Sequence, residues 1–288
     1  MMETLHLNPN PPKLRIRQIF QEAVAFSWGL RQKLWKWIIL GGALSGLPAL
    51  LNFLWKMNEE GEWVLAGLSE GMYFLLWSIS MIPWGIVFVI LAVYCHRSIL
   101  LDSFMGESGP RLIFSPREWT FFLWSFVLYV IVGFIMGLVV SVGSVLAASL
   151  MTAMDAGSFL EQMLRAPLMV RIWMAGFMCQ SFYFFGRWSL IFPAVSVDRD
   201  PSLMWSWKQT RGNGWRLAIL VGVVPTIASI IHELIWYYWG GVGILSSIFN
   251  VFLFSFTWVL VTPLEVAVIS IAFRELTNWK LVRQAELA

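Results

Sequence analysis

The fold class is decided by "WTFFLWSFVLYVIVGFIMGLVVSVGSVLAASL", residues 119–150, in which no residue is charged. A helix needs roughly 20 apolar residues to cross the hydrocarbon core of a bilayer, so this run is longer than one crossing requires. The strands of an outer-membrane barrel would instead be short and would alternate apolar and polar residues. The stretch therefore predicts a membrane-spanning helix that tilts or extends beyond the bilayer.

The rest of the chain has the same apolar character. Hydrophobic residues make up 58% of it and charged residues 13%, whereas about a quarter of a soluble protein is charged. We expect an all-α polytopic membrane domain over residues 34–273, with six spanning helices in three hairpins. The first run follows about 30 polar and amphipathic residues and is too long for a signal peptide, so we expect no cleaved signal. The other predicted spans are 34–55, 71–96, 170–195, 215–237 and 245–273.

The distribution of lysine and arginine predicts the orientation. Seventeen of the 20 lie in segments on one side of the predicted spans, and the first loop on the other side is acidic. Because cytoplasmic loops are enriched in Lys and Arg, both termini should be cytoplasmic, in a bacterial inner membrane. The opposite side holds Lys56, Arg165 and Arg171.

Four segments lie outside the predicted spans. Residues 1–12 are rich in Pro and Asn and should be a disordered lead-in, and residues 274–288 a cytoplasmic tail. Residues 13–33 have apolar positions at three- and four-residue steps, which predicts an amphipathic helix on the membrane surface. Residues 201–211 should form a short interfacial helix, with Asp200 as its cap, Pro201 in its first turn and Gly212 ending it in the left-handed conformation.

The chain also contains signs of an internal repeat. Each even-numbered span ends at an arginine, at Arg97, Arg187 and Arg274. In addition, "FSWGLRQKLWKW" from Phe26 matches "WSWKQTRGNGWRL" from Trp205, and the pairs are Trp28 with Trp207, Arg31 with Arg211 and Trp35 with Trp215. Trp and Arg are common at membrane interfaces in any case. The regular offsets nevertheless favour a hairpin repeat.

A family resemblance lies in the same region. "RWSLIFPAVSVDRDPSLMWSWKQTRGNGWRL", residues 187–217, resembles the fourth-helix end and the following loop of a family of six-helix bacterial membrane proteins. That family is similar to the membrane domain of some glycerophosphoryl diester phosphodiesterases. The resemblance implies a six-helix inner-membrane fold and no assigned activity. We expect no phosphodiesterase activity, because the tail from Arg274 to Ala288 is too short for a catalytic domain.

One acidic residue lies within a predicted span. Glu265 is nine residues before Arg274, which places it about 13 Å from the cytoplasmic interface. Ionisable groups at this depth are expensive and are candidates for function. Gln180 lies at a similar depth, and Arg187 could reach inward. The three residues could form a site for a proton, a cation or a lipid headgroup, or they could be a structural clamp between helices.

The sequence offers no constellation for catalysis. The three histidines, His6, His96 and His232, are scattered, and the two cysteines lie in apolar runs, so we expect no enzyme activity, metal or cofactor. Nucleic-acid binding is not expected either. The expected partners are anionic lipid headgroups, with a second copy of the chain as a possible partner through a small-residue stripe. The predicted lipid contacts are Trp205, Trp207, Lys208, Arg211, Trp215, Arg15 and Arg17, and the stripe is Gly133, Gly137 and Ser141.

These observations favour a non-enzymatic membrane protein that interacts with lipid and supports a partner or the envelope. The alternative is a small transporter or channel with a pocket near Glu265.

Overall fold

The computed structural model describes residues 11–59, 70–101, 109–110, 114–153, 179–239 and 244–279, and every regular element in these ranges is a helix. A helix over residues 179–188 precedes the short helix α6. The other elements are five long and two short helices, namely α1 (Ile16–Glu59), α2 (Glu70–Leu100), α3 (Pro116–Ala153), α6 (Ile191–Ser196), α7 (Leu203–Gln209), α8 (Gly214–Trp239) and α9 (Ile244–Thr277).

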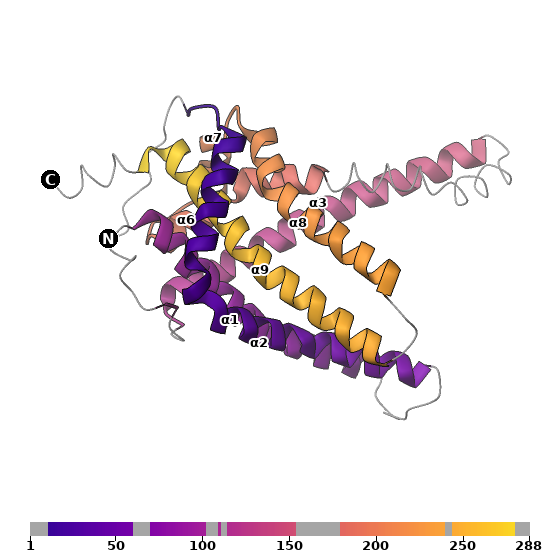
Figure 1. Cartoon of the computed structure of the whole chain (residues 1–288). Helices are drawn as coiled ribbons and strands as arrows, with labels where there is room; N and C mark the ends of the chain where they lie inside the picture. Colours follow the sequence, from indigo (N-terminus) through magenta and orange to yellow (C-terminus); the bar gives the residue numbers. More distant parts are fainter. Residues whose placement is uncertain are drawn as a thin grey trace.

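Three of the long helices, α1, α8 and α2, pack on α9, whereas α3 packs on α6 and α2 (Figure 1). α6 lies between α2 and α3 and also touches α9. Two apolar clusters fill the interior. One joins the start of α1 to the ends of α2 and α9, and the other joins α1, α2, α3 and α6. Fully buried members of the first cluster include Leu14, Leu190, Leu217, Phe273 and Leu276.

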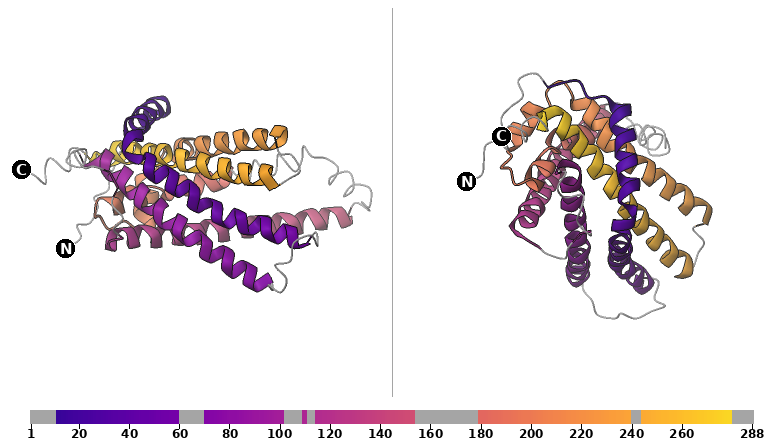
Figure 2. Two further views of the ribbon diagram at one scale, coloured as in Figure 1. Left: turned by 60° about the horizontal axis from the view of Figure 1, so that its bottom comes forward. Right: turned by 60° about the vertical axis from the view of Figure 1, so that its left-hand side comes forward.

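The predicted interfacial helix over residues 13–33 and the predicted first span are one helix in the structure. α1 begins at Ile16 and continues to Glu59, and it changes direction along its length (Figures 1 and 2). One face stays buried through the first part of the helix, at Ile19, Ala23, Leu30, Leu34 and Ile38. One apolar face of α1 is therefore buried continuously from its first turns to the part that packs in the bundle.

α7 is shorter than the predicted helix over residues 201–211, and its cap is a different residue. The side chain of Ser202 accepts a hydrogen bond from the backbone N–H of Trp205 at 3.1 Å, so Ser202 rather than Asp200 is the N-cap. Pro201 precedes the cap and is not in the first turn. The left-handed conformation predicted for Gly212 is confirmed, because its φ is 78°, a value that glycine adopts without steric cost. The helix itself ends earlier, at Gln209, with Thr210 as its C-cap.

The first turn of α3 is capped by the side chain of Glu118. Ser115 is the N-cap, and the Glu118 carboxylate accepts a hydrogen bond from the Ser115 backbone N–H at 2.9 Å and another from its hydroxyl. Pro116 fills the first helical position, where a missing N–H has no consequence. The start of this apolar helix is thus fixed by local sequence.

Most of the first part of α3 is exposed although it is apolar. Phe134, for example, is 65% exposed, and α3 runs on beyond its contacts with α6 and α2 (Figure 2). Soluble proteins rarely expose contiguous apolar patches of this kind, whereas lipid covers them without penalty. The exposed large apolar residues here are Trp119, Phe122, Leu123, Phe126, Val127, Tyr129, Val130, Phe134 and Leu138.

We expect Gly212→Ala to destabilise the protein by about 1 kcal/mol, because an alanine at φ 78° is strained. Gly29→Ala is the matched control. Gly29 lies within α1 with open space around its Cα, so alanine there should stabilise the helix by up to about 1 kcal/mol. Thermal unfolding in detergent measures both. Equal shifts of the two variants in the same direction would contradict the assignment.

Candidate functional site

The helix ends and connecting segments at one end of the bundle are joined by polar contacts. We call this end the polar end, and it comprises residues 11–22, 96–101, 114–118, 187–216 and 270–279. The side chain of Asn213 accepts a hydrogen bond from the N–H of Leu14 and donates one to the carbonyl of Pro12, both at 2.9 Å. Arg216 donates to the Leu14 carbonyl at 2.6 Å. The segment before α1 is therefore held on the turn between α7 and α8.

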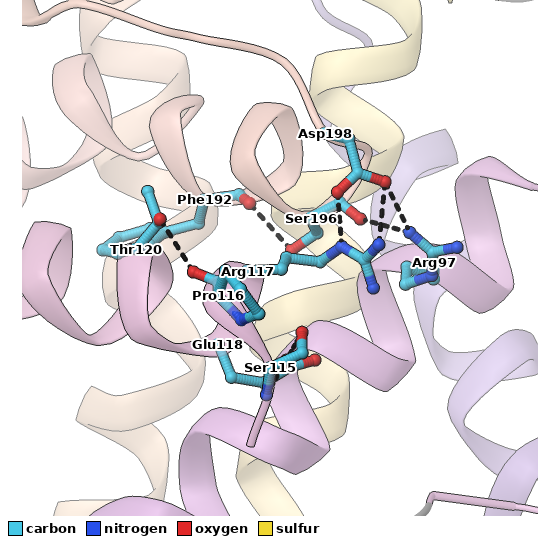
Figure 3. A network of polar contacts seen from close by, with 9 residues as sticks. All are labelled: Arg97, Ser115, Pro116, Arg117, Glu118, Thr120, Phe192, Ser196 and Asp198. Atoms are coloured by element: carbon cyan, nitrogen blue, oxygen red, sulfur yellow. Dashed lines mark hydrogen bonds and ion pairs between the residues drawn. The ribbon is translucent and has the colours of Figure 1, made fainter. Parts of the chain in front are cut away.

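Asp198 connects three elements of the polar end. Its carboxylate accepts two hydrogen bonds from Arg117 of α3, at 2.7 and 2.8 Å, and one from Arg97 of α2 at 3.3 Å (Figure 3). Arg97 also donates to the carbonyl of Ser196 at 3.0 Å. Asp198 has a φ of 62°, which is uncommon outside glycine, although Asp adopts it more readily than most residues.

Arg187 lies under α7 and holds it in place. Its guanidinium donates to the carbonyl of Trp207 at 2.5 Å and to that of Thr210 at 3.3 Å. The same group lies over the Trp207 ring, 4.0 Å from the centroid. In return, the Arg187 carbonyl accepts from the hydroxyl of Ser206 at 2.9 Å. Arg187 therefore fixes α7 and the residue after it against the helix over residues 179–188.

Aromatic side chains surround Trp207. Its ring centroid is 5.8 Å from that of Trp188, 6.1 Å from Phe184 and 6.3 Å from Tyr183. The neighbouring Gly214 leaves room for this packing, because a Cβ there would be 2.7 Å from the Tyr183 ring. The half-buried indole thus occupies a cage of aromatic rings with Arg187 on one face.

The end of α9 is joined to the other segments of the polar end by side-chain hydrogen bonds to backbone carbonyls and by one ion pair. Gln209 donates to the Leu276 carbonyl at 2.5 Å, and the indole N–H of Trp279 donates to the Leu100 carbonyl at 3.1 Å. Arg274 pairs with Glu22 of α1 at 2.5 Å. The three arginines that end the even-numbered predicted spans therefore bond to different elements: Arg97 to the end of α6 and the turn after it, Arg187 to the end of α7, and Arg274 to α1.

The proposed intramembrane site is not assembled as a contact network in the described residues. Glu265 and Gln180 are each half-buried, and neither shares a hydrogen bond or ion pair with Arg187 in these ranges. The polar contacts of Arg187 are directed to α7. Glu265 lies within α9, in the same helical turn as Pro263.

The predicted lipid contacts fall into two groups. Lys208, Arg211, Trp215, Arg15 and Arg17 are exposed. Trp207 is half-buried in the aromatic cage.

Trp205 requires a correction, because only 8% of it is exposed and its ring packs 6.3 Å from that of Phe273 in the first apolar cluster. The face of α7 that carries Trp205 is turned toward α9, which removes this side chain from contact with lipid.

The small-residue stripe lies on the exposed side of α3. Gly133, Gly137 and Ser141 are all exposed, and no described atom lies within 4 Å of the position that a Cβ would take at either glycine. Described residues of the same chain therefore do not occupy the stripe.

Residues suited to metal binding are not gathered in the described part of the chain. No three His, Cys, Asp or Glu side chains lie together there as a metal site would require. Nδ1 of buried His96 is 2.6 Å from the hydroxyl of Ser270, a contact that joins α2 to α9. Cys95 and Cys179 are free thiols. His6 lies outside the described residues, as does the side chain of His232.

Sequence reasoning missed several polar-end residues, above all Asn213, Gln209 and Trp279. Asn213 directly precedes α8, where an Asn is typical of a helix cap. Its amide instead bonds to residues about 200 positions earlier in the chain. No local pattern indicates such a partner. Gln209 and Trp279 likewise bond to carbonyls that become neighbours only in the folded chain.

The chain matches no known family model, no curated protein and no solved structure. The fold itself defines the class. This is an all-helical protein in which the described residues include two helices long and apolar enough to cross a membrane, Ser78–Leu100 and Pro116–Leu138. That observation, together with the exposed apolar face of α3, favours a membrane location.

We expect Arg187→Lys to lower the free energy of unfolding by about 2 kcal/mol. Lysine cannot reach two carbonyls with a planar group or stack on Trp207, so at least one charge-assisted hydrogen bond and the contact with the indole ring are lost. Asp198→Asn should change stability by less than about 1 kcal/mol, because Asp198 is more than half exposed and its ion pairs are screened. Chemical denaturation in detergent would test this ranking, and the reverse order would contradict it.

Proposed function

We propose that the protein is a multi-pass membrane protein, with the polar end in the cytoplasm, which binds anionic lipid and supports the envelope or a partner protein without being an enzyme. The excess of Lys and Arg in the segments that meet at the polar end supports this orientation. The resemblance of residues 187–217 to six-helix bacterial membrane proteins agrees with it. His96, the one histidine with a described side chain, serves the packing of α2 on α9.

One observation carries the proposal. Exposed tryptophans stand beside exposed cations on α1, where the Arg31 guanidinium lies 4.3 Å from the Trp28 ring centroid and the Lys36 ammonium 5.6 Å from that of Trp35. Indole rings favour the headgroup level of a bilayer, and cations favour anionic lipid there. A side chain pair of this kind fits the boundary between the membrane and the cytoplasm better than it fits bulk water.

We expect the exposed tryptophans to lie close to lipid headgroups. Protein labelled with 5-fluorotryptophan would be placed in bilayers, and Trp→Phe variants would assign the ¹⁹F resonances. A lipid with a spin label at its headgroup should broaden the resonances of Trp28, Trp35 and Trp215 several times more than that of Trp205. Trp205 is the internal control because it is buried.

Broadening of Trp205 equal to that of the exposed tryptophans would overturn the placement of Trp28, Trp35 and Trp215 at the headgroups. So would a lack of broadening at Trp28, Trp35 and Trp215.

Glu265 supports a second candidate function, a small transporter or channel. Its carboxyl is half-buried in α9 and has no hydrogen bond or ion pair with any described residue. A carboxyl in an apolar helix binds a proton readily, because the neutral form is much less costly to hold there.

We expect Glu265→Gln to raise thermal stability slightly, because a neutral amide replaces an acid in an apolar setting. If the residue belongs to a proton path, the same variant should lose proton uptake into proteoliposomes under an imposed potential. A loss of stability would instead identify a structural clamp. Gln180→Leu serves as the comparison, since it removes a half-buried polar group at a similar predicted depth.

A further inference from the structure

Two surfaces related by the internal repeat share the same pattern of exposure. Trp35 is 52% exposed and Trp215, 180 positions later, is 64% exposed. Ile39 and Ile219 are related by the same offset and are 56% and 46% exposed. The pairs Arg31 with Arg211 and Val24 with Met204 are also exposed on both sides. These residues define an α1 surface (Val24, Arg31, Trp35, Ile39) and an α8 surface (Met204, Arg211, Trp215, Ile219).

Buried positions follow the same offset. Leu30, Leu34 and Ile38 are buried in the bundle, and so are their counterparts Thr210, Gly214 and Ala218. The two segments therefore turn the same face inward and the same face outward. Trp205, Gln209 and Leu220 are exceptions, since they are buried whereas their counterparts Ala25, Gly29 and Leu40 are exposed. α8 has an extra neighbour, the helix over residues 179–188, as the contact between Gly222 and Phe182 shows.

The structure also changes one pairing suggested by the sequence. Trp28 is exposed, whereas Trp207 is half-buried in its aromatic cage, so these two tryptophans do not occupy equivalent places. At the offset of 180 the counterpart of Trp28 is Lys208, which is exposed. Both surfaces thus combine an arginine, a tryptophan and aliphatic residues, with one further exposed interfacial residue on each.

We propose that the α1 surface and the α8 surface are two equivalent binding sites for anionic phospholipid, each of which binds one headgroup. The arginine pairs with the lipid phosphate, the indole lies at the headgroup level, and Ile39 or Ile219 meets the acyl chains. One guanidinium nitrogen of Arg31 donates a hydrogen bond to the Trp28 carbonyl, and the other N–H groups of the guanidinium are left to donate to a phosphate. In the described residues the Arg211 side chain has no hydrogen-bond acceptor. This inference rests on the proposed function.

Native mass spectrometry of the detergent-purified full chain, titrated with phosphatidylglycerol or phosphatidylcholine, tests the proposal. The wild type should bind two phosphatidylglycerol molecules more tightly than the rest and should show no such preference for phosphatidylcholine. Arg31→Gln and Arg211→Gln should each weaken one of the two additions about fivefold, and the double variant should weaken both. Lys13→Gln removes the same charge from an exposed site outside both surfaces and should change neither addition.

Three outcomes would overturn the proposal of two lipid-binding sites. These are loss of both additions in one single variant, an equal loss in Lys13→Gln, and unchanged binding in all variants. Failure of the proposed function looks different, because the wild type would then retain neither lipid and its exposed tryptophans would not meet the spin-labelled headgroups. Thermal midpoints of the variants, expected at the wild-type value because both arginines are exposed, show that the fold is kept.

Discussion

Carbonyl groups that have no partner where helices end are the constraint on which the polar end depends. An α-helix leaves its last carbonyls unbonded, and burying them without partners costs about 1–3 kcal/mol each. At the polar end, side chains from distant segments supply the missing donors. Each bond thereby satisfies a helix end or turn and fixes one element against another. The donor and acceptor pairs at helix ends are Arg97 with Ser196, Arg187 with Trp207, Gln209 with Leu276, and Trp279 with Leu100. Arg216 bonds in a similar way to the Leu14 carbonyl, which lies before α1.

Features that depend on nearby residues could be predicted from the sequence. The helical class follows from long uncharged runs, and the left-handed turn at Gly212 follows from the freedom of glycine. Features that depend on which segments meet could not. Asp200 and Ser202 are both good helix caps, and the choice falls on Ser202 because the Asp198 turn and buried Pro201 fix where the chain enters α7. The partners of Asn213 lie at the other end of the sequence.

Tryptophan shows why composition alone does not assign a role. Trp205 packs in the interior, Trp207 sits beneath an arginine in an aromatic cage, and Trp215 is open to the surroundings. All three belong to one segment that sequence patterns treat as interfacial. The difference comes from the direction in which α7 turns its faces. One face meets α9, a second meets the helix over residues 179–188, and the turn after α7 carries Trp215 outward at the start of α8.

The continuity of α1 has a mechanical consequence. Gln32 stands 180 positions before Gly212 and cannot adopt a positive φ as easily, so α1 remains one helix where its counterpart is divided into α7 and α8. Because α1 is unbroken, its first turns are joined by helix hydrogen bonds to the part that packs in the bundle. α7 is instead joined to α8 through the turn at Gly212. The two matching segments thus differ in how directly their first helical turns are coupled to the long helix that follows.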